Sequence, residues 1–105
     1  MSKSFPTNKI SLGIKEHAYI FKSLYSPIRQ AILLEMKIAP VTETSCVKKF
    51  KLHPSTISQH FRNMVQSGVI REIRREKNNA IYYGVNEKVI NKAYEYLRNF
   101  TQDKI

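Results

Sequence analysis

The stretch L-H-P-S-T-I-S-Q-H-F-R, residues 52–62, decides the fold of this chain, because it predicts a helix together with the signal that starts it. Proline is best tolerated at the first helical position, where its missing N–H is not needed, so Pro54 begins the helix and His53 is its cap. Helical spacing then places four apolar side chains on one face: Ile57, Phe61, Met64 and Val65. The opposite face is polar and carries Ser55, Gln59, Arg62 and Gln66. Hydroxyl, amide and guanidinium groups match base edges and phosphates in a DNA major groove, so this face predicts DNA recognition.

The composition indicates a polyanionic partner. At 105 residues the chain is long enough for one domain with a modest core. Its 18 lysines and arginines exceed its 8 acidic residues by ten, and the pI is near 9.9. Six of these ten net charges lie between Lys48 and Lys77, where there are eight basic residues and two acidic ones. A solvated basic surface would explain the charge alone, but not its overlap with the predicted recognition helix.

The sequence also predicts the compartment. No apolar run approaches the roughly 18 residues of a membrane span, and the first residues lack the apolar core of a signal peptide. The single cysteine, Cys46, rules out an intrachain disulfide framework and is typical of a reducing compartment. We therefore expect a soluble, cytoplasmic protein that does not bind a membrane.

Three more helices are expected before the recognition helix. Apolar residues at three- and four-residue steps predict an amphipathic helix from about residue 9 through Ser23. Ser26 caps a second helix, which starts at Pro27 and ends before Pro40. Thr42 caps a short third helix, which carries three apolar side chains inward: Cys46, Val47 and Phe50.

After the recognition helix the periodicity changes from helical to β. Gly68 predicts a left-handed helix cap. Residues 69–75 and 80–85 are rich in β-branched and aromatic side chains and flank the polar tip E-K-N-N, so they predict a β-hairpin. A last amphipathic helix is expected from Asn86. Together these elements predict a mainly α fold of the α+β class, a winged helix-turn-helix with four helices, a hairpin wing and a fifth helix.

The order of these motifs resembles the arsenic-repressor (ArsR/SmtB) family of winged-helix transcription regulators. Four motifs carry the resemblance: F-K-S-L-Y-S-P-I-R-Q-A-I-L (21–33), L-H-P-S-T-I-S-Q-H-F (52–61), S-G-V-I-R (67–71) and I-Y-Y (81–83). The resemblance implies a symmetric dimer, formed by the first and last helices, that binds an imperfect palindrome in double-stranded DNA and represses transcription.

The resemblance also implies where DNA binds. It matches the family's contact positions to five residues of the recognition helix: Ser55, Thr56, Ser58, Gln59 and Arg62. The hairpin from Arg74 to Asn79 matches the wing. From the residue types, we expect basic side chains to contact phosphates or the minor groove: Arg62, Arg74, Arg75 and Lys77. Sequence preference would come from Ser55, Thr56 and Gln59, and the Gln59 amide suits two hydrogen bonds to adenine.

Apolar residues near both ends of the chain predict the dimer surface: Ile10, Ile14, Phe21, Ile90, Ala93, Leu97 and Phe100. So small a domain has spare apolar surface to bury, although the last helix would also suit packing on its own core. A dimer would place two recognition helices roughly 34 Å apart, one turn of the duplex. We expect residues 9–102 to form this DNA-binding and dimerisation domain, between a flexible arm (1–8) and a short tail (103–105).

The metal ligands of the family's best-known sensors are missing from the sequence. The resemblance places Thr42 and Thr44 where those sensors carry a Cys-x-Cys pair. Cys46 matches a leucine position, which predicts a small buried hydrophobe, with thiol sensing as the alternative. The last helix has no histidine, and its carboxylates share no ligand spacing. The sequence therefore predicts no metal and no cofactor, leaves open a nonstandard metal site between chains, and does not identify an effector.

The three histidines share no metal-ligand spacing, so we expect structural roles for all of them. His17 lies on the apolar face of the first helix, and His53 stands at the start of the recognition helix. His60 is expected to form a hydrogen bond near the helix packing.

No catalytic constellation is visible, with neither a glycine-rich phosphate loop nor an H-x-x-x-H pair, so the sequence predicts a protein that is not an enzyme. The alternative is a winged helix that binds RNA, binds DNA without sequence preference, or docks another protein, because fold does not imply function. RNA binding would need exposed aromatic rings, such as those of Tyr82 and Tyr83. One of two adjacent strand residues must face inward, which argues against that platform.

Overall fold

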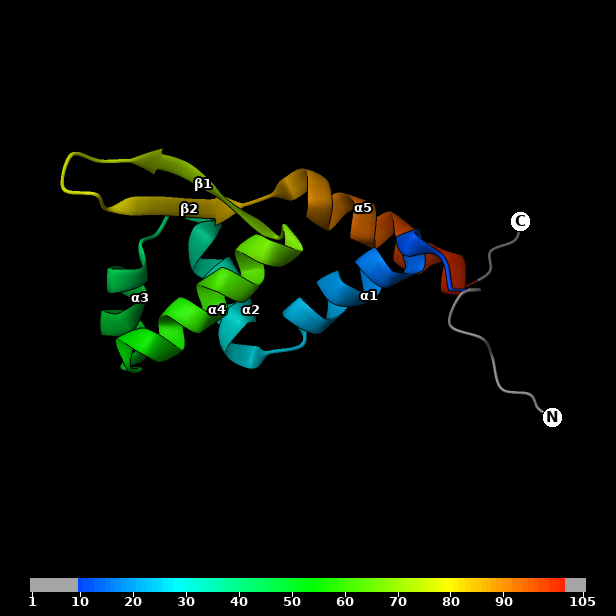
Figure 1. Ribbon diagram of the computed structural model, residues 1–105, viewed down its shortest axis with the longest axis horizontal. Helices are drawn as coiled ribbons and strands as arrows, with labels where there is room; N and C mark the ends of the chain where they lie inside the picture. Colours follow the sequence, from blue (N-terminus) through cyan, green and yellow to red (C-terminus); the bar gives the residue numbers. More distant parts are fainter. Residues whose placement is uncertain (1–9, 102–105) are drawn as a thin grey trace.

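The computed structural model describes residues 10–101, so the predicted arm (1–8), Lys9, Gln102 and the predicted tail (103–105) lie outside the described residues. In chain order the elements are α1 (Leu12–Leu24), α2 (Pro27–Met36), α3 (Glu43–Phe50), α4 (Pro54–Ser67), β1 (Ile70–Arg75), β2 (Ile81–Val85), α5 (Glu87–Leu97) and the 3₁₀ helix η2 (Arg98–Phe100) (Figure 1). The winged helix-turn-helix predicted from the sequence is therefore confirmed, with the β1–β2 hairpin as the wing.

The helix starts follow their capping residues. The Ser26 hydroxyl accepts a hydrogen bond from the Arg29 backbone N–H, and Pro27 is the first residue of α2, as expected. Thr42 caps α3 in a reciprocal capping box with Ser45. The predicted start of α1 near residue 9 was too early, because Ser11 caps this helix and Leu12 begins it.

The recognition helix α4 begins and ends at the predicted residues. The His53 Nδ1 atom accepts a hydrogen bond from the Ser55 backbone N–H at 3.0 Å. At the other end, Gly68 adopts a φ of 87°, the left-handed conformation that glycine tolerates best.

One residue of the predicted apolar face of α4 is placed differently. Ile57, Phe61 and Met64 are at most 1% exposed, whereas Val65 is 44% exposed. At about 100° per residue, Val65 lies about 80° around the helix from Ile57, at the border of the apolar face. The prediction that Val65 belongs to the buried face was wrong for this reason.

The wing is an antiparallel hairpin with one irregularity. Arg74 pairs with Tyr82 and Glu72 with Tyr83, and a bulge at the intervening Ile73 shifts the register. At the tip, Asn79 has a φ of 67°, as predicted for an asparagine in a tight turn. Backbone hydrogen bonds between Val41 and Tyr83 attach the wing to the segment that leads into α3.

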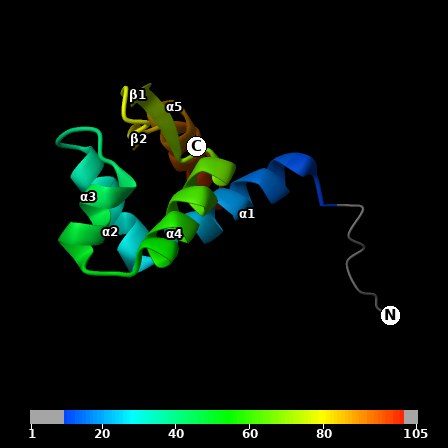
Figure 2. The same ribbon diagram turned by 60° about the vertical axis from the view of Figure 1, so that its left-hand side comes forward.

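The core holds α4 at the centre of the molecule. Its largest fully buried apolar side chains come from α2, α3, α4, β1 and the residue that precedes β1: Ile32, Cys46, Ile57, Phe61, Met64, Val69 and Ile70. Figure 2 shows α4 between α3 on one side and α1 on the other, and both helices contact it. At the far end from the wing, α1 packs against α5 (Figure 1). Within residues 10–101, no helix combines the length and the apolar character that crossing a lipid bilayer requires.

Candidate nucleic-acid interface

Four of the five predicted contact residues of α4 are exposed. Their side chains lie on the face opposite the core: Ser55, Thr56, Gln59 and Arg62. The fully buried Ile57, Phe61 and Met64 fix the rotation of the helix about its axis. Short polar groups and one guanidinium are therefore presented to solvent on a helix anchored by its opposite face.

Ser58, the fifth predicted contact residue, is placed differently. It is half-buried, and its hydroxyl donates a hydrogen bond to the Glu43 carboxylate at 2.5 Å. This bond links the first residue of α3 to the second turn of α4. No pattern in the sequence marks Glu43 as part of the site, since the two residues are 15 positions apart and only the packing of the two helices brings them together.

The predicted basic residues of the wing are exposed on the hairpin. The Arg74 guanidinium lies 4.0 Å from the centre of the Tyr82 ring, and its Nε is 3.4 Å from the Glu76 carboxylate. Arg75 is paired with Glu72 at 3.2 Å. Exposed ion pairs of this kind contribute at most about 1 kcal/mol, so both arginines can exchange their partners for phosphates at little cost. Lys77 is exposed at the tip.

The tyrosine pair belongs to the packing of the wing. The Tyr83 ring packs edge-on against Phe61 of α4, with ring centres 5.1 Å apart. Burial raises the pKa of Tyr83, and the carboxylates of Glu43 and Glu72 raise it further. Tyr82 is half-buried beneath the Arg74 guanidinium. The two rings thus attach the wing to α4 and support its arginine.

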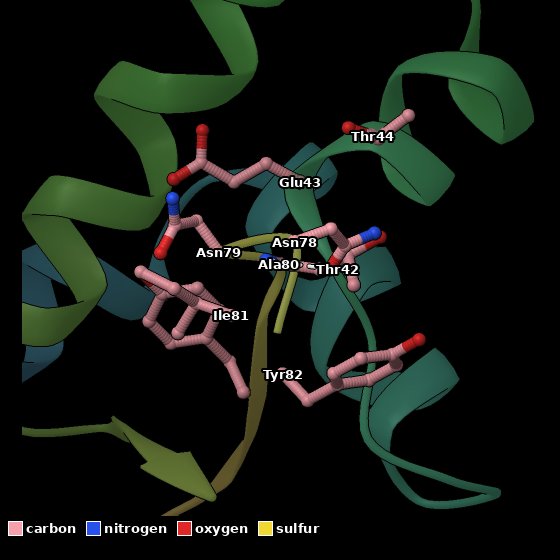
Figure 3. A pocket seen from close by; sticks show the side chains of 9 residues that line it. Thr42, Glu43, Thr44, Asn78, Asn79, Ala80, Ile81 and Tyr82 are labelled. Atoms are coloured by element: carbon pink, nitrogen blue, oxygen red, sulfur yellow. Dashed lines mark hydrogen bonds between the residues drawn. The ribbon is translucent and has the colours of Figure 1, made fainter. Parts of the chain in front are cut away.

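A groove separates the tip of the wing from the start of α3 (Figure 3). It has a volume of about 410 Å³ and is lined by Thr42, Glu43, Thr44, Asn78, Asn79, Ala80, Ile81, Tyr82 and Tyr83. Thr42 and Thr44 stand where the family resemblance places a metal-binding cysteine pair, so the side chains that line the groove offer hydroxyls, amides and one carboxylate but no thiol. Across residues 10–101, His, Cys, Asp and Glu side chains form no group of three that could hold a metal ion.

Cys46 and His60 lie inside the helix-turn-helix. Cys46 is 2% exposed, as predicted for a small buried hydrophobe, and burial raises the pKa of its thiol from 9.0 to about 11. The His60 Nδ1 atom accepts a hydrogen bond from the Arg29 Nε at 3.0 Å. Burial, and then the Arg29 guanidinium, lower the pKa of His60. His60 thus connects α4 to α2, as expected of a structural histidine.

The predicted dimer residues gather where α1 meets α5 and η2. In the single chain Ile14 is 47% exposed, Leu97 46% and Phe100 70%. Ile10, Phe21 and Ile90 are half-buried. Ala93 is only 3% exposed, so it packs within the chain and has little surface left for a partner.

An aromatic stack orders this end of the molecule. The rings of His17 on α1 and Tyr96 on α5 lie face to face, with their centres 3.9 Å apart. Phe100 packs edge-on against Tyr96. The stack holds the two helices together and keeps their exposed apolar side chains on a defined surface.

Known proteins are similar to this chain in sequence and in fold. The model of the bacterial regulatory protein, arsR family, matches residues 26–72, from the cap of α2 into β1. The transcriptional repressor SdpR of Bacillus subtilis (strain 168) is 30% identical over 81 residues, which cover 77% of this chain and 88% of that protein. This chain belongs to the ArsR family. It is therefore a winged-helix transcriptional regulator, and the resemblance inferred from its motifs is confirmed.

Solved structures show the same fold as this ArsR-family chain. An ArsR-like transcriptional regulator from Rhodococcus sp. RHA1 matches with a TM-score of 0.74 at 20% identity, over 84% of this chain and 81% of that one. The transcriptional repressor PagR of Bacillus anthracis matches with a TM-score of 0.62 at 28% identity, over 81% and 97%. Mb0332 from Mycobacterium bovis, described as a homodimeric winged helix-turn-helix DNA-binding domain, matches with a TM-score of 0.68 at 15% identity, over 92% and 87%.

Proposed function

We propose that this ArsR-family regulator is a homodimeric repressor that recognises an imperfect palindrome in double-stranded DNA. One observation carries the proposal: the exposed polar face of α4 lies on the same molecule as an exposed basic hairpin, in a chain of net charge +10. The relatives SdpR and PagR are both named as transcriptional repressors, which supports repression rather than activation.

The two parts of the interface have different tasks in this proposal. Phosphate contacts by Arg62, Arg74, Arg75 and Lys77 supply affinity that falls steeply with salt, because each contact releases a counterion from the DNA. Base contacts by the exposed side chains of Ser55, Thr56 and Gln59 supply sequence preference. Ser58, first assigned to DNA, instead positions α4 through its hydrogen bond to Glu43.

A dimer follows from the exposed apolar surface where α1 meets α5. Ile14, Leu97 and Phe100 are each at least 46% exposed, and burying them against a second copy removes apolar area from water. The two-fold symmetry of such a dimer places both copies of α4 on one face of the duplex and demands a palindromic site. The homodimeric description of Mb0332 supports this assembly.

The proposed repressor lacks the Cys-x-Cys pair through which members of the family sense soft metals. Thr42 and Thr44 offer no thiolate at those positions, and the lone Cys46 is buried in the core. We therefore propose that DNA release, where it occurs, uses neither of the family's known metal sites.

A fluorescence-anisotropy titration tests the proposal. The purified protein is titrated against duplexes that tile the region upstream of its own gene, with a scrambled duplex as control, at two salt concentrations. We expect one duplex to bind at least ~10³-fold more tightly than the scramble, the difference typical of specific sites. Equal binding of every duplex, with affinity that collapses at the higher salt, would refute sequence-specific regulation from this region.

A further inference from the structure

Lys51 occupies a backbone conformation that is unfavourable for lysine. It is the residue that ends α3, with φ 56° and ψ 44°, in the left-handed region, and its backbone N–H donates to the Val47 carbonyl at 2.9 Å. A Cβ atom crowds the backbone in this conformation, which is why helices so often end in glycine. Gly68 fills the corresponding position after α4. A lysine at position 51 thus makes the fold less stable than a glycine would.

The turn needs the left-handed backbone but does not use the lysine side chain. Only Lys51, Leu52 and His53 separate α3 from α4. Leu52 packs against the core and His53 caps α4, so the side chains of both neighbours stabilise the fold. The Lys51 side chain is exposed, and within residues 10–101 no hydrogen bond or ion pair holds it.

The position of Lys51 places its positive charge next to the start of the recognition helix. It lies two residues before the cap of the recognition helix. The N-terminal residues of such a helix contact base edges in the major groove, so an exposed lysine just before them is placed near the phosphates that border the groove. The neighbouring Lys49, by contrast, is paired with Glu35 at 3.3 Å. We infer that Lys51 is a phosphate contact, kept as lysine at a cost in folding stability. This inference rests on the proposed DNA binding and adds to it a residue outside the predicted contact set.

Two substitutions separate the charge of Lys51 from its backbone strain. Lys51→Gly removes both, whereas Lys51→Gln removes the charge and keeps a side chain on the strained backbone. Lys88→Gln is the matched control, because it removes one exposed charge from the first turn of α5, which lies near the C-terminal end of α4 and not near its start at Pro54. Each protein is titrated against the best duplex and the scramble at several salt concentrations, and is unfolded in urea.

Both Lys51 variants should weaken binding to both duplexes by the same factor, roughly fivefold per protomer at about 0.15 M salt. The slope of log K against log salt should shrink by about 0.9 per protomer. Lys51→Gly should unfold at higher urea than the wild type, Lys51→Gln should not, and Lys88→Gln should leave the slope unchanged.

The inference is overturned by an unchanged salt slope in both Lys51 variants, by a loss confined to one duplex, or by an equal change in Lys88→Gln. A wild type that prefers no duplex over the scramble defeats the proposed operator binding instead. In that case the salt slopes on the scramble still decide whether Lys51 contacts phosphate.

Discussion

At the scale of single residues, some polar side chains of α4 form hydrogen bonds to neighbouring helices and others are exposed to solvent. The Ser58 hydroxyl donates to Glu43 and the His60 Nδ1 accepts from Arg29, so both side chains hold α4 against its neighbours. Gln59, between them in sequence, is exposed. Adjacent residues of a helix point about 100° apart, so Gln59 can be exposed while Ser58 and His60 contact other helices.

Gln59→Ala should relax sequence preference rather than abolish binding. If the amide forms two hydrogen bonds to adenine, its removal lowers discrimination at one base position per half-site by about 1–3 kcal/mol. Competition titrations with single-base variants of the best duplex measure this. Gln30→Ala removes the same group from the exposed surface of α2, outside the predicted contact set, and is the matched control. An equal loss of affinity on every duplex would show that Gln59 does not read a base.

Cys46 should react slowly with alkylating agents while the protein is folded. With a pKa of about 11 instead of 9.0, the thiolate is about 100-fold rarer near pH 8, and burial blocks access besides. Labelling with iodoacetamide at pH 8, with and without urea, gives the two rates. Comparable rates in both conditions would revive the thiol-sensing alternative that the sequence left open.

At the scale of elements, two side-chain bonds set how α4 sits against its neighbours. Ser58 to Glu43 joins α4 to α3, and His60 to Arg29 joins it to α2, where the same guanidinium also donates to the Ser23 carbonyl of α1. The angle of the recognition helix thus depends on polar contacts as well as on the apolar core.

Glu43→Gln should tighten binding to every duplex. The amide oxygen still accepts from Ser58, but the variant loses a negative charge that borders the grooves beside α4 and the wing. Anisotropy titrations should show an affinity gain of several-fold that shrinks as salt rises. Ser58→Ala provides the contrast, since it should lower the free energy of unfolding by about 1 kcal/mol without removing a charge. Weaker binding by Glu43→Gln would indicate that the carboxylate itself contacts DNA.

The partial burial of His60, next to the Arg29 guanidinium, predicts a loss of stability in mild acid. Because the folded pKa lies below the unfolded value of about 6.5, the unfolded chain takes up the proton more readily. This contribution is fully present above pH 6.5 and is lost as the pH falls through the unfolded pKa toward the folded one. Urea midpoints at pH 7.5 and 5.5 should differ more for the wild type than for His60→Gln. If the urea midpoint changes equally with pH in both proteins, His60 is not the cause of the acid sensitivity.

The helix ends could be predicted from the sequence because they depend on local backbone and capping chemistry. Features that depend on contacts between elements could not be predicted. Pro54, Thr42 and Gly68 act through their own backbone or capping geometry, so the helix ends they predict are where the structure has them. The role of Ser58 depends on a residue of another helix, and the burial of Ala93 on the packing at the α1 and α5 end. The hydrophobic periodicity of a single helix indicates neither the partner of Ser58 nor the burial of Ala93.

At the scale of the whole molecule, the surfaces proposed for DNA binding and for dimer formation lie at different ends. The wing and α4 form the basic part, and the apolar surface of α1, α5 and η2 lies at the other end (Figure 1). A partner bound at the apolar end therefore leaves the recognition surface free. This separation is what a two-fold dimer on one duplex requires, since the seam and the DNA contacts must not compete for the same residues.

Leu97→Asp should convert the dimer into a monomer with much weaker DNA binding. Leu97 is 46% exposed beside the aromatic stack, so a carboxylate there costs little in the single chain but would be buried unpaired in the dimer seam. Leu34→Asp is the matched control, because Leu34 is 62% exposed on α2, outside the predicted seam. Analytical ultracentrifugation should find the wild type and Leu34→Asp dimeric and Leu97→Asp monomeric. A dimeric Leu97→Asp, or a monomeric Leu34→Asp, would place the seam on another surface, and the spacing of the two half-sites would then have to be derived again from that surface.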